Sequence, residues 1–186
     1  MQLDREIENF VKTLAAGGVE VYNEFSLQHE LGIFLRNHLS GCRVQFERNV
    51  AYFNLSKLSL EKREIDIVVT PADSAALLSA IELKYPRNGQ VPEQMFSFCK
   101  DIAFLEQLVS GGFKSAYFLA LADDPLFYSG NEHGIYRFFR SGAPITGTIT
   151  KPTGSRDKTV HIVGSYVARW LPLTRSTRFC LVPVGS

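Results

Sequence analysis

The chain has 186 residues, a hydrophobic content of 45% and a net charge of +1, which together suit a single domain with a substantial core. No run approaches the roughly 18 uncharged apolar residues of a membrane-spanning helix, so we expect no membrane partner. The three cysteines are far apart and indicate neither a disulfide framework nor a zinc site, and residues 1–6 are too acidic and polar for a signal peptide. We therefore expect a cytoplasmic protein.

Charge is distributed unevenly along the chain. Residues 1–133 contain 12 Lys and Arg against 18 Asp and Glu, whereas residues 134–186 contain 8 Lys and Arg against a single acid, Asp157. This asymmetry indicates an acidic site beside a basic surface that binds a polyanion. The alternative is that the basic residues simply solvate a β-rich tail.

Apolar residues at helical spacing predict two helices near the N-terminus. The first covers residues 3–14 and is ended by Gly17–Gly18. The second begins near Asn23 or Ser26 and continues to about Leu39. Its apolar stripe is expected to pack on a sheet formed by the segments that follow.

Three strands are expected next. The segment from Arg43 to Leu55 alternates only partially between apolar and polar side chains. The runs Glu64–Val69 and Ala80–Tyr85 are rich in Ile, Val and Tyr, and they are closed by Pro71 and Pro86. These features are typical of strands.

A long helix from Pro92 to about Val109 and a continuous apolar run from Ser115 to Leu121 follow. The run is typical of a buried parallel strand, because a helix between two strands forms a crossover connection. After Pro125, turn-forming residues separate short segments that we expect to be strands, namely Ile135–Phe139, Ile145–Thr150, Thr159–Val163 and Arg178–Val182.

This order of elements predicts an α/β fold with a central mixed β-sheet flanked by helices, and we expect the helices to cover one face of the sheet. The chain is interpreted as a single domain. Its core covers about residues 20–125, and residues 126–186 form a basic, β-rich C-terminal extension.

Two acids and a lysine on the central strands form a candidate catalytic group. Side chains alternate along a strand, so Glu82 and Lys84 share one face, and Asp66 can lie beside them on the neighbouring strand. Hydrolysis of a phosphodiester bond needs an attacking water and neutralisation of developing negative charge, and Mg²⁺ held by one or two carboxylates helps with both. We therefore predict that Asp66, Glu82 and the carbonyl of Leu83 bind Mg²⁺, for which Mn²⁺ can substitute. Lys84 would lie next to the reacting water, the alternative being a surface ion pair at a sheet edge.

The residues Asp66…Glu82-Leu83-Lys84 resemble the PD-(D/E)xK signature of the restriction-endonuclease-like nucleases. The resemblance covers about residues 26–121, in the order helix, hairpin with Asp, strand with Glu-x-Lys, helix and strand. Ile65 stands where the signature has proline, a departure that is common in the family. The resemblance implies a restriction-endonuclease-like core, a metal held by the Asp and the Glu, and a lysine that assists the water.

Two more catalytic candidates follow from this resemblance. Many members have an acid on the helix before the sheet, and Glu30 is placed there. Gln94 is similar in position to a glutamine of the RecB-like exonucleases, which have a tyrosine four residues later. Because Phe98 stands at that later position here, we predict an endonuclease. The alternatives are a solvated helix position for Glu30 and a helix-capping role for Gln94.

The expected partner is nucleic acid, most simply DNA, and nucleases of this fold that cut both strands often form homodimers. An RNase, or a catalytically silent module that binds nucleic acid or protein, are the alternatives. Aromatic residues among the basic ones could stack on bases, namely Tyr128, Tyr136 and Phe138–Phe139. Contacts to the phosphate backbone are expected from Arg87, Arg137, Arg140, Lys151, Arg156 and Lys158.

Overall fold

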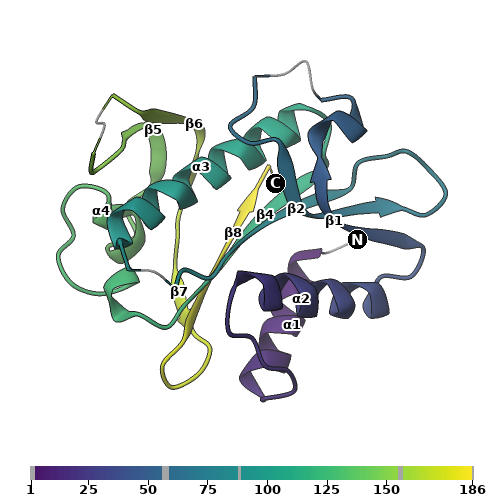
Figure 1. Cartoon of the computed structure of the whole chain (residues 1–186), viewed down its shortest axis with the longest axis horizontal. Coiled ribbons are helices and arrows are strands. Elements are labelled where there is room, and N and C mark those ends of the chain that lie inside the picture. Colours follow the sequence, from purple (N-terminus) through teal and green to yellow (C-terminus); the bar gives the residue numbers. More distant parts are fainter. Residues whose placement is uncertain (1–2, 56–58, 88, 155–156, 186) are drawn as a thin grey trace.

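The computed structural model describes residues 3–55, 59–87, 89–154 and 157–185. Its centre is a six-stranded sheet with helices on both faces (Figure 1). The strand order is β1-β2-β3-β4-β8-β7, and among these neighbours only β3 and β4 run parallel. The strand bounds are β1 Cys42–Asn49, β2 Glu64–Pro71, β3 Ser79–Lys84, β4 Ser115–Ala122, β7 Trp170–Pro172 and β8 Arg178–Val184.

Helices α1 (Leu3–Ala15) and α2 (Glu24–His38) cover one face of the sheet, and α3 (Val91–Ser110) covers the other (Figure 1). The mixed sheet and its flanking helices confirm the predicted α/β class. The expectation that only one face is covered was wrong. In β2 and β3, the side chains on both faces of the sheet are buried, which requires a helical layer on each face.

The start of α2 is fixed by a capping box. The side chain of Asn23 accepts a hydrogen bond from the Ser26 N–H at 2.8 Å, and the Ser26 hydroxyl accepts one from the Asn23 N–H at 3.0 Å. Each of these bonds satisfies a backbone donor that the first helical turn leaves unpaired. Of the two starting points considered, Asn23 is therefore the N-cap, and Glu24 lies in the first turn.

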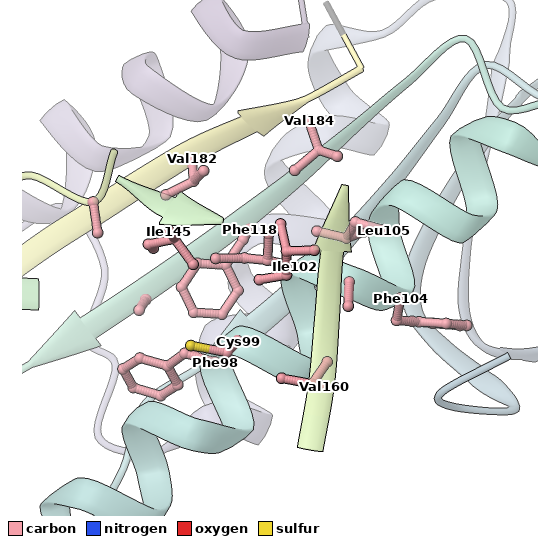
Figure 2. Packing of buried hydrophobic residues seen from close by; sticks show 14 of the residues in the cluster. Phe98, Cys99, Ile102, Phe104, Leu105, Phe118, Ile145, Val160, Val182 and Val184 are labelled. Carbon is pink, nitrogen blue, oxygen red and sulfur yellow. The ribbon is translucent and has the colours of Figure 1, made fainter. Parts of the chain in front are cut away.

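Helix α3 is the crossover between the parallel strands β3 and β4, and it is buried on almost every side. Phe98, Cys99 and Ile102 point from this helix toward Phe118 of β4, as Figure 2 shows. The rings of Phe98 and Phe118 have centroids 5.3 Å apart. A helix that is apolar around most of its circumference lies in a core, and here it has the sheet on one side and a hairpin on the other.

That hairpin consists of β5 (Ile145–Thr150) and β6 (Thr159–Tyr166), whose apolar residues join the core around α3 (Figure 2). The remainder of the expected β-rich extension, strands β7 and β8, belongs to the main sheet and extends it beyond β4. The C-terminal residues therefore complete the core. Strands β7 and β8 do so within the main sheet, and the β5–β6 hairpin does so from the other side of α3.

Two predicted strands differ from the structure. The strand expected up to Leu55 ends at Asn49, whose side chain accepts a hydrogen bond from the Ala51 N–H, and a 3₁₀ helix (Val50–Phe53) follows. The strand expected at Ile135–Phe139 is a short helix, α4 (Tyr136–Arg140), and a second 3₁₀ helix covers Pro125–Phe127. Phe138 and Phe139 are consecutive and both buried. A helical turn allows this, whereas a strand would direct them to opposite faces.

Candidate active site

Asp66 and Glu82 lie side by side where β2 begins and β3 ends. Antiparallel pairing of Ile67 with Ile81 places the two acids opposite each other on the face covered by α3. The backbone N–H of Leu83 donates to Asp66 Oδ2 at 2.7 Å, and the N–H of Asp66 donates to Glu82 Oε1 at 3.4 Å. The structure therefore brings the two predicted metal-binding carboxylates together.

Lys84, the third member of the predicted group, is held by two further acids. Its Nζ lies 3.2 Å from Glu24 Oε1 and 3.5 Å from Asp101 Oδ2. It also donates to the Leu83 carbonyl at 2.8 Å, so the carbonyl expected to bind a metal accepts a hydrogen bond here. These contacts fix the ammonium at the end of β3, on the side where Asp66 and Glu82 lie.

Glu24 and Asp101 were not among the predicted site residues. Glu24 is in the first turn of α2, and its second oxygen accepts from the Tyr85 N–H at 3.4 Å. Asp101 lies on α3, within the arc of buried residues that includes Phe98 and Leu105. An acid inside an apolar stripe was the available signal for Asp101, because such a residue needs a polar partner in the core.

Lys62 is a second lysine that sequence reasoning missed. Its Nζ contacts the Glu82 carboxylate and lies 3.2 Å from Asp101 Oδ1 and 3.9 Å from Asp66 Oδ1. The sequence before β2 suits either a polar turn or an extension of the strand, and no periodic pattern there indicates which side chain folds inward. The ammonium of Lys62 lies among three carboxylates.

We call these six side chains the carboxylate–lysine cluster: Glu24, Lys62, Asp66, Glu82, Lys84 and Asp101. It contains four carboxylates and two ammonium groups, so with every group ionised two negative charges are not balanced within it. Glu82 is fully buried and Asp101 is 2% exposed. Uncompensated charge at this depth is costly, and it favours binding of a proton or a cation.

The pKa values follow from this arrangement. Burial raises the pKa of Asp66 from 3.8 to about 6, against the opposing effect of Lys62 and Lys84. Burial, together with the neighbouring Asp66 and Asp101, raises the pKa of Glu82 well above its usual 4.5. Although burial alone would lower the pKa of Lys84, the carboxylates of Asp101, Glu24 and Asp66 raise it above 10.5. Lys84 is therefore a cation at neutral pH, suited to donating hydrogen bonds to an anion.

One oxygen of the cluster has no hydrogen-bond partner. Asp101 Oδ2 is buried without a hydrogen bond, although the Lys84 ammonium lies 3.5 Å away. In the described part of the chain, no three His, Cys, Asp or Glu side chains are placed so that they could hold a metal ion as they stand. Lys62 occupies the space among the carboxylates, so the donor set suits a hard divalent cation only if that ammonium moves aside.

The structure does not bring Glu30 to the cluster. Its carboxylate lies 3.2 Å from His29 Nδ1, whereas Glu24 and Gln28, one turn apart on α2, face the strand ends. Gln28 donates to the Asp66 carbonyl at 2.9 Å and to Glu47 Oε1 at 2.6 Å. Gln94 is half-buried on α3, two turns before Asp101 on the same side of the helix.

Several residues that were predicted to bind the phosphate backbone of a nucleic acid make contacts within the protein. Arg87 pairs with Asp123, Lys151 Nζ lies 3.2 Å from Glu93, and Arg140 donates to the Asn131 carbonyl at 2.6 Å. The guanidinium of Arg137 lies 4.8 Å from the Phe138 ring centroid, and Lys158 is exposed. Arg156 lies outside the described residues. Phe138 and Phe139, considered for base stacking, are in the core and cannot stack on a ligand.

No protein-family model, curated protein or solved structure matches this chain. The relation to PD-(D/E)xK nucleases therefore remains a hypothesis that depends on the motif and on the geometry around it. Among the described residues, no helix combines the length and the apolar character needed to cross a membrane.

Proposed function

We propose that this protein is a Mg²⁺-dependent nuclease with a restriction-endonuclease-like core, which hydrolyses phosphodiester bonds within DNA strands. The observation that supports this most directly is the charge of the carboxylate–lysine cluster. Four acids face two lysines at the ends of β2 and β3, and one buried oxygen of Asp101 has no hydrogen-bond partner. A divalent cation that displaces the Lys62 ammonium brings two positive charges in place of one, and oxygen atoms of carboxylates are its preferred ligands.

Five residues of the cluster have a role in this proposal, and the sixth, Lys62, has to move aside when the ion binds. Asp66, Glu82 and Asp101 would hold the ion, which supplies neutralisation of phosphate charge and a more acidic water. The N–H of Leu83 orients the Asp66 carboxylate at 2.7 Å. The Lys84 ammonium would donate a hydrogen bond to a phosphate oxygen, and Glu24 holds that ammonium in place at 3.2 Å.

The proposal is tested with supercoiled, linear, branched and single-stranded DNA, and with RNA, in the presence of Mg²⁺, Mn²⁺ or EDTA. We expect metal-dependent cleavage that falls by about 100-fold or more in Asp66→Asn, Asp101→Asn and Lys84→Ala. Asp73→Asn is the control, because Asp73 is an exposed acid at the opposite end of β2. An absence of cleavage on every substrate would contradict the proposal, and cleavage of RNA alone would assign an RNase.

Lys62 favours a second candidate, a catalytically silent binding module. Its ammonium already contacts Glu82 and lies 3.2 Å from Asp101, where a cation would otherwise bind. A protein that uses this internal cation permanently has no need for a metal. Isothermal titration with Mn²⁺ distinguishes the two: heat that Glu82→Ala removes supports the nuclease, and no heat at millimolar metal supports the module.

A further inference from the structure

Two aromatic side chains at the start of α2 are exposed to solvent. Phe25 is 77% exposed and Tyr22 is 64% exposed. Phe25 follows Glu24, the acid that holds Lys84, and Tyr22 precedes the N-cap of the same helix. A single exposed apolar residue is common on a protein surface, so the position of the ring relative to the candidate active site decides whether it is a candidate ligand contact.

Phe25 borders the position of Asp66. A small cavity of about 20 Å³ at the ends of β2 and β3 is lined by Glu24, Phe25, Gln28, Glu47, Asp66 and Leu83. A phosphodiester bound at Lys84 and Asp66 would therefore place its neighbouring nucleoside close to the Phe25 ring.

Hydrogen bonds fix the backbone that carries the two rings. The Ser26 hydroxyl accepts hydrogen bonds from the N–H groups of both Tyr22 and Asn23, at 2.9 and 3.0 Å. The Asn23 side chain closes the capping box by accepting from the Ser26 N–H at 2.8 Å. Because the backbone that holds both rings is fixed, little conformational freedom is lost when a flat ligand packs against them.

The charge around Phe25 indicates which part of a nucleic acid it contacts. Three of the residues that share its cavity are acids, Glu24, Glu47 and Asp66. Apart from the scissile phosphate, which Lys84 and the proposed metal ion would hold, these acids disfavour a further phosphate beside the ring. A nucleobase has no net charge and presents a flat face to an aromatic ring. In a duplex both faces of each base are covered by its neighbours, so only an unpaired base can stack on a protein ring.

We propose that Phe25 forms a stacking surface for an unpaired base next to the scissile phosphate. The preferred substrate of the proposed nuclease would then contain a single-stranded segment at the cleavage position. This inference depends on the proposed function only for the location of the phosphate, and binding tests it without cleavage.

The test measures binding in EDTA, where metal-dependent cleavage does not occur. The probes are a single-stranded oligonucleotide with 2-aminopurine, whose fluorescence falls on stacking, and the matching duplex. We expect quenching and tighter binding with the single strand, and about tenfold or greater loss in Phe25→Ala and Phe25→Leu. Phe25→Trp keeps a ring and retains binding. Ile33→Ala, an exposed apolar site elsewhere on α2, is the control and binds as the wild type does.

Equal affinity for duplex and single strand, or full binding by Phe25→Leu, overturns the inference. So does a change in the sedimentation coefficient of the free protein in Phe25→Ala, because the ring would then serve a contact between copies. Metal-dependent cleavage with no effect of Phe25 on binding would support the proposed nuclease activity and contradict the proposed stacking surface. Stacking on Phe25 without cleavage of any substrate would support the stacking surface and contradict the proposed nuclease activity.

Discussion

A single ammonium compensates much of the negative charge in the carboxylate–lysine cluster. Lys62 reaches Glu82, Asp101 and Asp66 from the segment just before β2, and Glu82 is fully buried. Removing one partner of a buried ion pair leaves the other charge without compensation, which costs more than the pair itself contributes. Lys62 is therefore expected to stabilise the metal-free protein and to compete with a metal for the same oxygen atoms.

Lys62→Met tests this competition. In EDTA we expect the free energy of unfolding to fall by about 3 kcal/mol, because Glu82 loses its counter-ion. We also expect Mg²⁺ to raise the melting temperature more in this variant than in the wild type, since no ammonium has to be displaced. Differential scanning calorimetry with and without Mg²⁺ measures both effects.

The matched control is Lys100→Met, because Lys100 pairs with Glu61 at 3.7 Å on the surface. An exposed pair contributes about 1 kcal/mol or less, so this variant should remain close to the wild type. If Lys62→Met is as stable as Lys100→Met and shows no additional response to Mg²⁺, Lys62 does not act as the internal cation.

Asp66 gives the metal-free protein a specific dependence on pH. Its pKa is about 6 in the folded chain against 3.8 ordinarily, so the folded state binds this proton more tightly than the unfolded state does. The stabilisation of the folded state by protonated Asp66 is fully present below the ordinary pKa of 3.8, and it is lost as the pH rises through about 6.

Asp66→Asn removes this titration while keeping an oxygen that can accept from Leu83. Between pH 4 and pH 7 the wild type is expected to lose up to about 3 kcal/mol relative to the variant. Urea unfolding in EDTA at several pH values gives this difference directly. Parallel pH profiles for the two proteins would show that Asp66 has an ordinary pKa.

At the scale of elements, local patterns gave most of the correct predictions. The helical stripes located α1, α2 and α3, and the apolar runs located β2, β3 and β4, because these signals depend only on residues close in the chain. The short segments after residue 125 were less informative. Two adjacent buried phenylalanines, Phe138 and Phe139, occur in a helical turn that composition alone assigns to a strand.

In the candidate site too, residues that follow from local patterns were predicted, and residues placed by tertiary packing were missed. Asp66, Glu82 and Lys84 could be placed together, since strand alternation and the order of strands determine their common face. Glu24 was missed in favour of Glu30, because the two lie about 120° apart around α2 and only tertiary packing selects the side. Lys62 could not be predicted, since its position depends on the path of an irregular segment.

Glu106 connects α3 to the β5–β6 hairpin. Its carboxylate accepts from the N–H groups of Val163 and Gly164 at 2.9 and 2.6 Å, and from the Tyr166 hydroxyl at 2.9 Å. These bonds to a charged acceptor hold β6 against the helix, next to the apolar contacts of the hairpin.

Glu106→Ala is expected to lower the free energy of unfolding by about 2 kcal/mol and to accelerate hydrogen exchange of the β6 amides. Glu93→Ala is the control, because Glu93 also joins α3 to this region but through one partly exposed ion pair with Lys151. Unchanged exchange in β6 would mean that apolar packing alone holds the hairpin.

At the scale of the whole molecule, the C-terminal residues and the motif strands belong to one sheet. Strand β8 pairs with β4 along its length, and β7 pairs with β8, so residues 170–184 share a core with β3. The sequence could not show this pairing, because the partners are separated by more than 50 residues of intervening chain.

This arrangement predicts a single cooperative unfolding transition. Trp170, the only tryptophan, lies on β7 and reports on the C-terminal strands by fluorescence. Its urea midpoint is expected to coincide with the midpoint from far-UV circular dichroism, which reports on the helices. Two separate midpoints would show that residues 126–186 unfold independently of the rest.

The position of β8 also has a consequence for synthesis on the ribosome. All six residues of the carboxylate–lysine cluster lie between positions 24 and 101, so they emerge well before Arg178. Until β8 arrives, the apolar strand β4 has an open edge, and open edges pair readily with other chains. Strand β8, which is translated after β4, therefore determines when the edge of β4 is no longer open to pairing with other chains.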